Sequence, residues 1–266
     1  MRPAVKDGAT PRLRLGHVPI DAVTFAGALD AIEALVAAGR GGVVFTPNVD
    51  HVVLAERDER FRAAYVTADL SLADGQPLVW SSRLLGAPLP EKVSGSDLLL
   101  PLMDLAAARG WRVFLLGAGP GVAEAAAERL RRERGVDVVG TAAPFVRVGP
   151  DEPDPAGDAA ALAVRDARPH LVLVAFGAPK QELWMHRQRT ALAPAVLLGI
   201  GASLDFVAGR VRRAPRWMSR AGLEWLWRLL REPRRLWRRY LVEDPRFLAV
   251  LWRTMGERRR ANPPSA

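Results

Sequence analysis

Short apolar runs that alternate with longer amphipathic segments constrain the fold of this chain most strongly. Six runs have the length of strands, and segments with helical spacing of apolar residues lie between them. A strand that is apolar throughout is typical of a parallel sheet with helices on both faces. The sequence therefore predicts an α/β fold, with strands over residues 42–46, 69–73, 112–117, 136–140, 171–177 and 195–201.

The segments between these runs predict the helices that cover such a sheet. Several of them end at glycine, which commonly closes a helix in the left-handed conformation. The segment from Lys180 onward also begins a helix, directly after a Gly and Pro turn. The remaining helices are expected over residues 21–40, 49–65, 96–110, 121–135 and 159–167.

The pattern changes after Val207, where apolar strands stop and arginine-rich helical segments begin. We therefore predict three parts: a Rossmann-like body over residues 1–207, a helical appendage over 208–258 and a disordered tail over 259–266. The net charge of +9 is concentrated in the appendage, because residues 209–260 hold 16 arginines and five acidic residues. We therefore expect the appendage, rather than the body, to carry the positively charged surface that binds a partner.

Composition excludes several classes of chemistry. The chain has no cysteine, so disulfides, thiolate zinc sites and cysteine nucleophiles are excluded, and a reducing compartment suits it. The first 20 residues lack the apolar segment of a signal peptide, and no stretch has the length of a membrane-spanning helix. We expect a cytoplasmic protein that associates peripherally with the inner face of the cell membrane.

In an open parallel sheet, ligands bind at the carboxyl ends of the strands. Polar segments follow four of the predicted strands at that point: "TPNVDH", "ADG", "GAGPG" and "GAPKQE". In "GAGPG", Gly117 and Gly119 lie between a strand and a helix, where free backbone N–H groups can approach a phosphate. A simple tight turn explains the same glycines equally well, and a dinucleotide fingerprint would require Gly or Ala at Val122.

Lys180 begins a helix, where a cation opposes the helix dipole unless an anion lies beside it. We interpret Lys180 as a phosphate-facing residue, with a solvated lysine as the alternative. Asp74 follows a strand and precedes glycine, so it is either a turn former or a general base. Asn48 and Asp50 likewise either cap the next helix or line a site. Asp205 has the same two interpretations.

No metal site is predicted. The four histidines are scattered without metal-ligand spacing, and no D-x-D pair is present to hold a divalent ion on a diphosphate. A serine triad is unsupported because the chain has no G-x-S-x-G turn. We expect no cofactor.

Together these segments resemble the WecG/TagA/CpsF family of bacterial glycosyltransferases, which assemble cell-surface polymers on lipid carriers. The likeness extends in order through "FTPNVDHVV", "LADGQPLVW", "VFLLGAGPGVAEA" and "LVLVAFGAPKQELW" to "GIGASLDFVAGRVRRAPRWMSRAGLEWLWRLLREPRRLWRRYL". About 200 residues follow the pattern, which is far more specific than a single motif. The resemblance implies an inverting, metal-independent transfer from a UDP-sugar, typically UDP-N-acetylmannosamine, to a polyprenyl-diphosphate-linked sugar.

The resemblance also implies a role for each site residue. Asp74 is the expected general base, with Gln181 near the reacting sugar and diphosphate. Thr46 and Asn48 line the donor pocket, and Asp205 meets the uridine. The expected catalytic residues are Asp74, Gln181 and Thr46; the donor-binding residues are Asn48, Gly117, Gly119, Lys180, Glu182 and Asp205; the acceptor or diphosphate-binding residues are Lys92, Asp97, Arg213, Arg216 and Arg220.

The appendage has a two-sided helix in "RRLWRRYL". Leu236, Trp237, Tyr240 and Leu241 lie on one face, with arginines opposite. Either the apolar face docks on the body and the arginines are solvated, or the helix lies at a membrane with anionic headgroups. We favour the membrane, where a lipid-linked acceptor would be found. No nucleic-acid-binding motif is visible, and a homo-oligomer is compatible with the family.

Three alternatives stay open from sequence. A UDP-hexose transferase for exopolysaccharide would share the same site. A nicotinamide-dependent oxidoreductase would also use a glycine loop and alternating strands. A non-catalytic basic adaptor for membranes or nucleic acid would explain the arginines without any enzyme activity.

Overall fold

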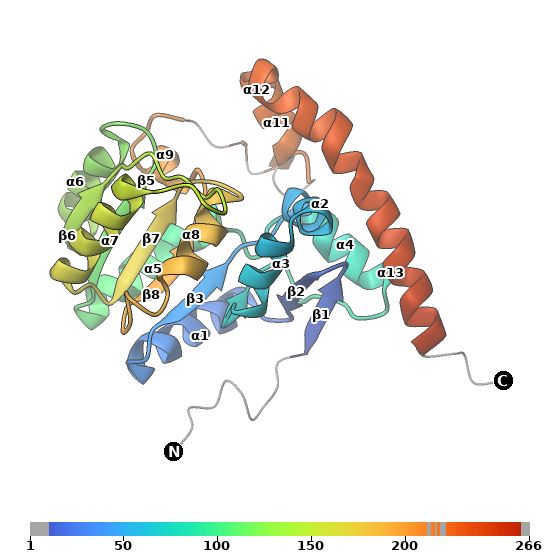
Figure 1. Cartoon of the computed structure of the whole chain (residues 1–266), viewed down its shortest axis with the longest axis horizontal. Coiled ribbons are helices and arrows are strands. Elements are labelled where there is room, and N and C mark those ends of the chain that lie inside the picture. The colour runs from blue at the N-terminus through green and yellow to red at the C-terminus, as the bar shows by residue number, and fades with distance from the viewer. Residues whose placement is uncertain (1–10, 212–213, 216, 219–221, 262–266) are drawn as a thin grey trace.

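The computed structural model describes residues 11–211, 214–215, 217–218 and 222–261. Within them, a six-stranded sheet lies between two layers of helices (Figure 1). The strand order is β4-β3-β8-β7-β5-β6, and every neighbouring pair is parallel. The predicted α/β fold is therefore confirmed. The strands are β3 (Gly42–Phe45), β4 (Leu70–Ser71), β5 (Arg112–Gly117), β6 (Asp137–Ala142), β7 (Leu171–Ala175) and β8 (Val196–Gly199).

Both faces of the sheet are covered, because successive strand side chains point to opposite faces. In β3, Val43 and Phe45 belong to one buried cluster and Val44 to the other. The first cluster includes residues of α2 (Val49–Arg57), α3 (Glu59–Val66), α4 (Gln76–Leu84), α7 (Pro155–Ala167) and α8 (Lys180–Gln188). The second includes residues of α1 (Phe25–Ala38), α5 (Gly95–Arg109), α6 (Val122–Arg134) and α9 (Ser203–Val207).

A hairpin at the start of the described chain was not predicted. β1 (Arg12–Leu15) pairs antiparallel with β2 (Val18–Asp21) in a separate two-stranded sheet. The side chain of Asp21 accepts a hydrogen bond of 2.8 Å from the Ser71 backbone N–H, which joins the hairpin to β4. The alternation of buried Leu13, Leu15, Val18 and Ile20 is the sequence signal that would have found it.

Two predicted helices differ from the structure. The segment after Asn48 is two helices, because Asp58 ends α2 and caps the N-terminus of α3 with its side chain. The helix expected from residue 21 begins at Phe25 instead, with Thr24 as its cap, since Asp21 belongs to β2. The predicted strand over 69–73 is also shorter, being limited to Leu70–Ser71.

The C-terminal part is helical, as predicted, and its last helix packs on the body. α13 (Phe247–Ala261) contacts α2 and β1, and its Phe247, Val250 and Leu251 are buried in the cluster shared with α2. The prediction of a disordered tail from residue 259 was wrong for residues 259–261, which are part of α13. The preceding elements are α11 (Glu224–Arg231), α12 (Pro233–Arg238), the π-helix η1 (Arg239–Glu243) and the 3₁₀-helix η2 (Asp244–Arg246).

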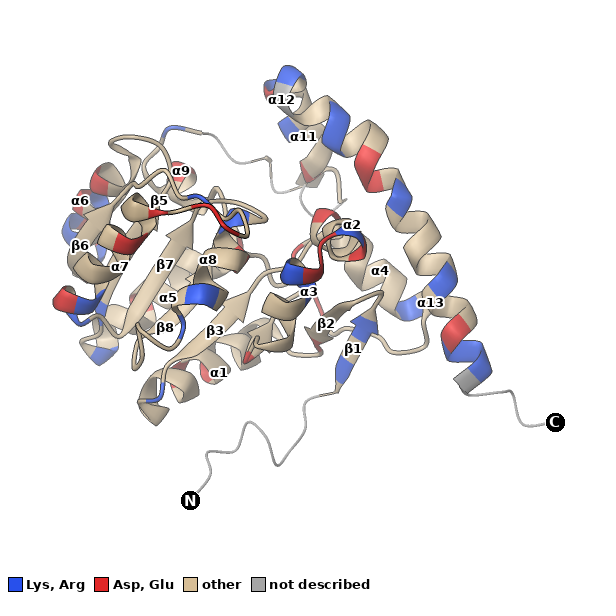
Figure 2. Ribbon diagram, in the orientation of Figure 1, with Lys and Arg blue, Asp and Glu red and all other residues tan. Residues whose placement is uncertain are grey.

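Basic residues recur along α13 and near α12, where blue segments of the ribbon mark Lys and Arg in Figure 2. No helix among the described residues combines the length and the apolar composition needed to cross a membrane.

Candidate active site

The predicted site residues that follow strands lie at one edge of the sheet. Because all six strands are parallel, the segments after β3, β4, β5, β7 and β8 meet at the carboxyl edge. Hydrogen bonds join neighbouring segments: Asp74 N–H donates to the Pro47 carbonyl at 2.8 Å, Thr46 Oγ1 donates to the Gly199 carbonyl at 2.9 Å, and Gly201 N–H donates to Gln181 Oε1 at 2.9 Å. Asp74 and Gln181 thus belong to one continuous edge.

Asp74 lies in the turn between β4 and α4, in the segment where Gly75 has a φ of +123° that suits glycine. Burial raises the pKa of Asp74 to about 7, and Glu224 acts in the same direction. Lys92 and Arg228 act to lower this pKa. A carboxylate that titrates near neutral pH is suited to general base catalysis, since it exists in both protonation states under working conditions.

Lys92 and Asp97, both predicted to border the cleft, lie next to Asp74. Lys92 Nζ is 2.8 Å from Asp97 Oδ2 and 3.9 Å from Glu224 Oε2. Burial acts to lower the pKa of Lys92, but the hydrogen bond from Lys92 to Asp97 and the nearby carboxylates raise it overall. Lys92 is therefore a cation beside the candidate base.

α11 brings two charged groups to Asp74 that sequence reasoning missed. The charges of Glu224 and Arg228 both affect the pKa of Asp74. The Arg228 guanidinium also lies 5.8 Å from the centre of the Phe206 ring, at the end of α9. α11 thus lies near both the β4–α4 turn and α9. Nothing in the sequence distinguishes Arg228 from the other arginines of the appendage, because its role depends on where α11 packs.

The glycine loop, residues 117–121 from the end of β5 to the start of α6, makes a tight turn. Gly117 has a φ of +103°, and a Cβ there would lie 2.8 Å from the Ala175 backbone, so only glycine fits. Gly121, with φ +72°, precedes α6. A side-chain nitrogen of Arg210 lies 3.8 Å from where a Gly121 Cβ would be. Gly121 therefore lies beside a cation at the N-terminus of α6, the positive end of a helix, an arrangement that suits a phosphate. The donor-binding roles of Gly117 and Gly119 stay a prediction.

Lys180 contacts the loop that follows β6. Its Nζ donates to the Val146 carbonyl at 3.0 Å and lies 4.0 Å from the centre of the Phe145 ring. Phe145 is 74% exposed, so this contact lies at the surface of the carboxyl edge. An ammonium group has three donors, and one is used by Val146. The phosphate-facing role of Lys180 stays a prediction.

Gln181 and Glu182 are both buried, with 2% and 0% of their surface exposed. Gln181 Nε2 donates to Glu182 Oε1 at 2.8 Å. Burial raises the pKa of Glu182 to about 7, although the hydrogen bonds it accepts act to lower it. With no exposed surface, Glu182 does not reach the open edge in this structure. Its predicted direct contact with the donor is therefore unsupported.

Asn48 caps α2, the simpler of its two interpretations. Its Oδ1 accepts from the backbone N–H groups of Asp50 and His51 at 3.0 and 3.4 Å. Arg239 of the appendage lies 3.4 Å from the same Asn48 oxygen and 3.2 Å from Asp50 Oδ2. This contact joins η1 to the segment after β3. Burial raises the pKa of Asp50, which Arg239 acts to lower.

Asp205 lies in α9 and joins this short helix to the segment that follows it. Its backbone carbonyl accepts from the N–H groups of Arg210 and Val211 at 3.0 and 3.3 Å. These contacts bring Arg210 back from the end of α9 toward the glycine loop. The predicted acceptor-binding residues Arg213, Arg216 and Arg220 lie outside the described residues.

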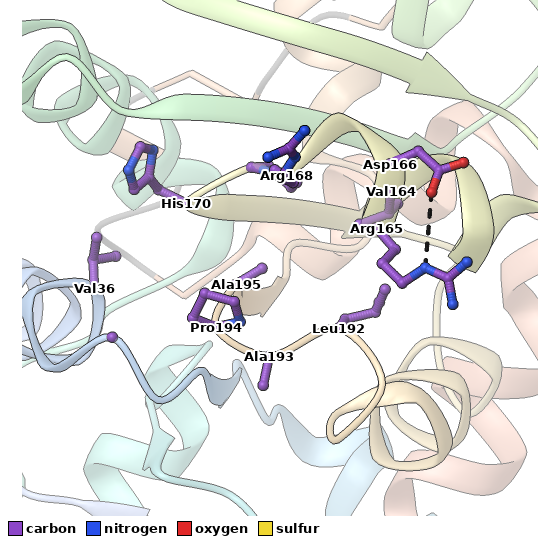
Figure 3. Close-up of a pocket in the computed structure, with 12 residues that line it drawn as sticks. Val36, Val164, Arg165, Asp166, Arg168, His170, Leu192, Ala193, Pro194 and Ala195 are labelled. Atoms are coloured by element: carbon purple, nitrogen blue, oxygen red, sulfur yellow. Dashed lines mark ion pairs between the residues drawn. The ribbon is translucent and has the colours of Figure 1, made fainter.

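A hollow of about 700 Å³ lies at the opposite, amino edge of the sheet (Figure 3). It is lined by the end of α1, the end of α7 and the loop before β8, and its charged residues Arg165, Asp166 and Arg168 are exposed. None of the predicted site residues lines it. Since parallel sheets bind ligands at the carboxyl edge, we assign the site there. Among the described residues, no three His, Asp or Glu side chains are grouped to hold a metal.

The fold and the site together define a class of protein. A parallel sheet that gathers a glycine loop, cations and a carboxylate of raised pKa at its carboxyl edge is typical of an enzyme acting on a phosphorylated or nucleotide-linked substrate. The chain belongs to the WecG/TagA/CpsF family of glycosyl transferases, whose model matches residues 13–261. It is therefore a glycosyltransferase, and the resemblance found in the sequence is confirmed.

Two curated relatives from Bacillus have the same printed name, N-acetylglucosaminyldiphosphoundecaprenol N-acetyl-beta-D-mannosaminyltransferase. The protein from Bacillus spizizenii is 36% identical over 225 residues, which cover 84% of this chain and 83% of the relative. The protein from Bacillus subtilis is 32% identical over 214 residues, 79% of each chain. This membership decides against the oxidoreductase and the non-catalytic adaptor that the sequence alone left open.

Proposed function

We propose that this glycosyltransferase moves an N-acetylmannosamine-type sugar from UDP to a sugar linked to polyprenyl diphosphate, in the synthesis of a cell-surface polymer. The printed names of both relatives support this sugar and this class of acceptor. The observation that carries the chemistry is Asp74, a carboxylate of pKa about 7 beside Lys92 and Arg228 at the carboxyl edge. A UDP-hexose donor is the second candidate, since no contact of the described residues at the carboxyl edge distinguishes one donor sugar from another.

In the proposed reaction, ionised Asp74 takes the proton from the acceptor hydroxyl. The hydroxyl oxygen attacks the anomeric carbon of the donor as its bond to UDP breaks, which inverts that carbon. The leaving diphosphate gains negative charge, and fixed cations and helix N-termini stabilise it. Lys180, Arg210 and the N–H groups after Gly117 are the proposed groups, so no metal or cofactor is required.

The decisive experiment tests the donor and the metal together. The protein is incubated with a panel of UDP-sugars and a synthetic lipid-diphosphate N-acetylglucosamine, and UDP release is measured with and without a chelator. We expect UDP-N-acetylmannosamine to give the fastest release and the chelator to leave the rate unchanged. Preference for a UDP-hexose would identify the second candidate, and loss of turnover with the chelator would contradict the metal-free mechanism.

We also propose that the C-terminal helices bind the cytoplasmic face of an anionic membrane. Trp237 and Leu241 are 51% and 57% exposed, whereas Arg239 of the same segment pairs with Asp50 of the body. These three positions therefore favour the membrane over the alternative with a docked apolar face and solvated arginines. Further along, Leu248 and Trp252 are 67% and 77% exposed on α13. Exposed tryptophan near arginine suits a headgroup boundary.

Cosedimentation with vesicles tests this surface. Each arginine near an anionic surface contributes about 1 kcal/mol, so binding should require anionic lipid and weaken with salt. We expect Trp252→Ser to reduce binding to phosphatidylglycerol vesicles several-fold. Leu162→Ser, at an exposed leucine of α7, is the matched control. Equal binding by both variants, or equal binding to neutral vesicles, would contradict the proposal.

A further inference from the structure

The buried pair Gln181–Glu182 has a geometry that fixes the direction of an amide. Gly201 N–H can only donate, so it requires the oxygen of the Gln181 side chain, and the observed contact is 2.9 Å. Glu182 Oε1 faces the other end of the same amide at 2.8 Å and accepts from Nε2. The two contacts require the same orientation of the amide. If the acceptor at position 182 were removed, the hydrogen bond from Gly201 would be the one left to this amide among the described residues.

Gln181 in turn lies against the end of β8. A Cβ at Gly199 would be 2.4 Å from Gln181 Nε2, so the amide occupies space that only glycine leaves open. From the β3 side, Thr46 Oγ1 donates to the Gly199 carbonyl at 2.9 Å. Two buried side chains therefore hold this segment: Thr46 binds Gly199 from the β3 side, and Gln181 binds Gly201 from α8. This fixes the turn from which α9 starts at Ser203.

The turn determines where two groups at the carboxyl edge lie. α9 contains Asp205, whose backbone carbonyl accepts from Arg210 N–H at 3.0 Å. The Arg210 side chain lies near Gly121 of the glycine loop. A shift of the β8–α9 turn would move Asp205 and Arg210 together, and with them one side of the proposed donor site.

We propose that Glu182 is a positioning residue, which acts through the Gln181 amide to hold the β8–α9 turn where Asp205 and Arg210 meet the donor nucleotide. It does so without touching substrate, because none of its surface is exposed. This inference rests on the proposed UDP-sugar donor and adds a residue that acts only at a distance. If Glu182 has this role, a change at position 182 weakens donor binding and leaves acceptor binding near Lys92 unchanged.

The surroundings of Glu182 make a conservative replacement possible. Among the described residues, Glu182 Oε2 is buried without a hydrogen-bond partner. A glutamine can therefore keep its oxygen toward Gln181 and place its NH₂ group at the position of Oε2. A methionine has a similar length and lacks the acceptor. The pair Glu182→Gln and Glu182→Met thus separates the hydrogen bond from the volume of the side chain.

The experiment measures the donor KM, the acceptor KM and kcat of both variants, together with their melting temperatures. We expect Glu182→Met to raise the donor KM about tenfold, roughly the effect of one lost hydrogen bond, with the acceptor KM within twofold. Glu182→Gln should restore the donor KM to within about threefold of the wild type. Met185→Leu, a volume-conserving change at another buried residue of α8, is the matched control and should change neither KM.

A double-mutant cycle tests whether Glu182 acts through Gln181. Gln181→Leu alone should raise the donor KM, and adding Glu182→Met should then raise it by less than about twofold. Independent, multiplying effects would overturn the proposal, as would a folded Glu182→Met variant with an unchanged donor KM. Should Glu182→Met fail to fold, Gly199→Ala decides instead. It displaces the same amide, so it must raise the donor KM selectively, and an unchanged KM overturns the proposal.

The wild-type protein is assayed in the same series. If it releases UDP from no UDP-sugar, the proposed function fails and this inference fails with it. If the wild type turns over and the donor KM does not depend on position 182, only the positioning role is lost.

Discussion

The sheet body and the C-terminal helices are held in place by different interactions. In the body, Thr46, Gln181 and Glu182 are almost fully buried. Thr46 and Gln181 are hydrogen-bonded to Gly199 and Gly201 at the end of β8, and Glu182 accepts from its neighbour Gln181. α11 has no buried residue, and it reaches the site through charged groups such as Arg228. α13 is intermediate, since one of its faces is buried on α2.

The difference indicates a division of roles at one site. In the proposed reaction the body supplies rigid positions for the donor, because packed cores and satisfied buried amides leave little freedom. The appendage supplies charge beside Asp74 from α11, a helix with no fully buried residue. The four predictions below test that division, in order of decreasing effect.

Asp74→Asn should have the largest effect, because it removes the only proposed proton acceptor. We expect kcat to fall by about 10²- to 10⁴-fold, the usual contribution of a general base. UDP binding, measured by calorimetry, should change little because the donor side of the site is intact. Retained turnover would mean that the body supplies its base elsewhere.

The pH dependence of the wild type should show the state of Asp74. Its pKa is raised to about 7, and the base acts when ionised, so kcat should fall about tenfold per pH unit below 7. The rate is measured between pH 5 and 9 with saturating substrates. If kcat instead began to fall only near pH 4, Asp74 would be solvated during turnover and α11 would not cover it.

Arg228→Ala tests the contribution of the appendage. Arg228 lowers the pKa of Asp74, so its removal should raise that pKa and shift the acid limb of the rate profile to higher pH. We expect kcat at pH 7 to fall about tenfold, or roughly 1.4 kcal/mol of transition-state stabilisation. Arg234→Ala, an exposed arginine of α12, is the control and should leave the profile unchanged. A shift in both variants would indicate a general charge effect.

Arg239→Ala should have the smallest effect, on stability rather than rate. It leaves Asp50 buried without this cation, so we expect a decrease of about 1–2 kcal/mol in the free energy of unfolding and a fall of a few degrees in Tm. Burial raises the pKa of Asp50, and losing Arg239 raises it further. The deficit should therefore shrink as pH falls and Asp50 is protonated. Arg238→Ala, which removes an exposed pair with Glu243, is the control.

Much of the body could be predicted because its signals are local. The run "RVFLLG" is apolar throughout and forms β5 over the predicted residues, and glycines end α1, α5 and α6 as expected. The hairpin β1–β2 was missed because its alternation is short. The break at Asp58 was missed because a capping aspartate looks like an ordinary polar residue within a helical pattern.

The site was predictable only to the level of the sheet edge. Strand ends identified the segments of Thr46, Asp74, Gly117 and Gln181, because parallel strands bring their carboxyl ends together. The partners of those residues required distant segments. Glu224 and Arg228 are about 150 residues from Asp74 in the chain, and no local pattern marks them as its neighbours.

The sequence by itself determined the parallel sheet, the edge to which we assign the site and the family, since apolar periodicity and ordered motifs are properties of the chain. Only the tertiary structure decided that Glu182 is buried behind Gln181, that Asn48 caps a helix and contacts Arg239, and that α11 brings charge to Asp74. Burial and the pKa of a carboxylate depend on which remote segments exclude water from it, and this is settled only when the chain packs.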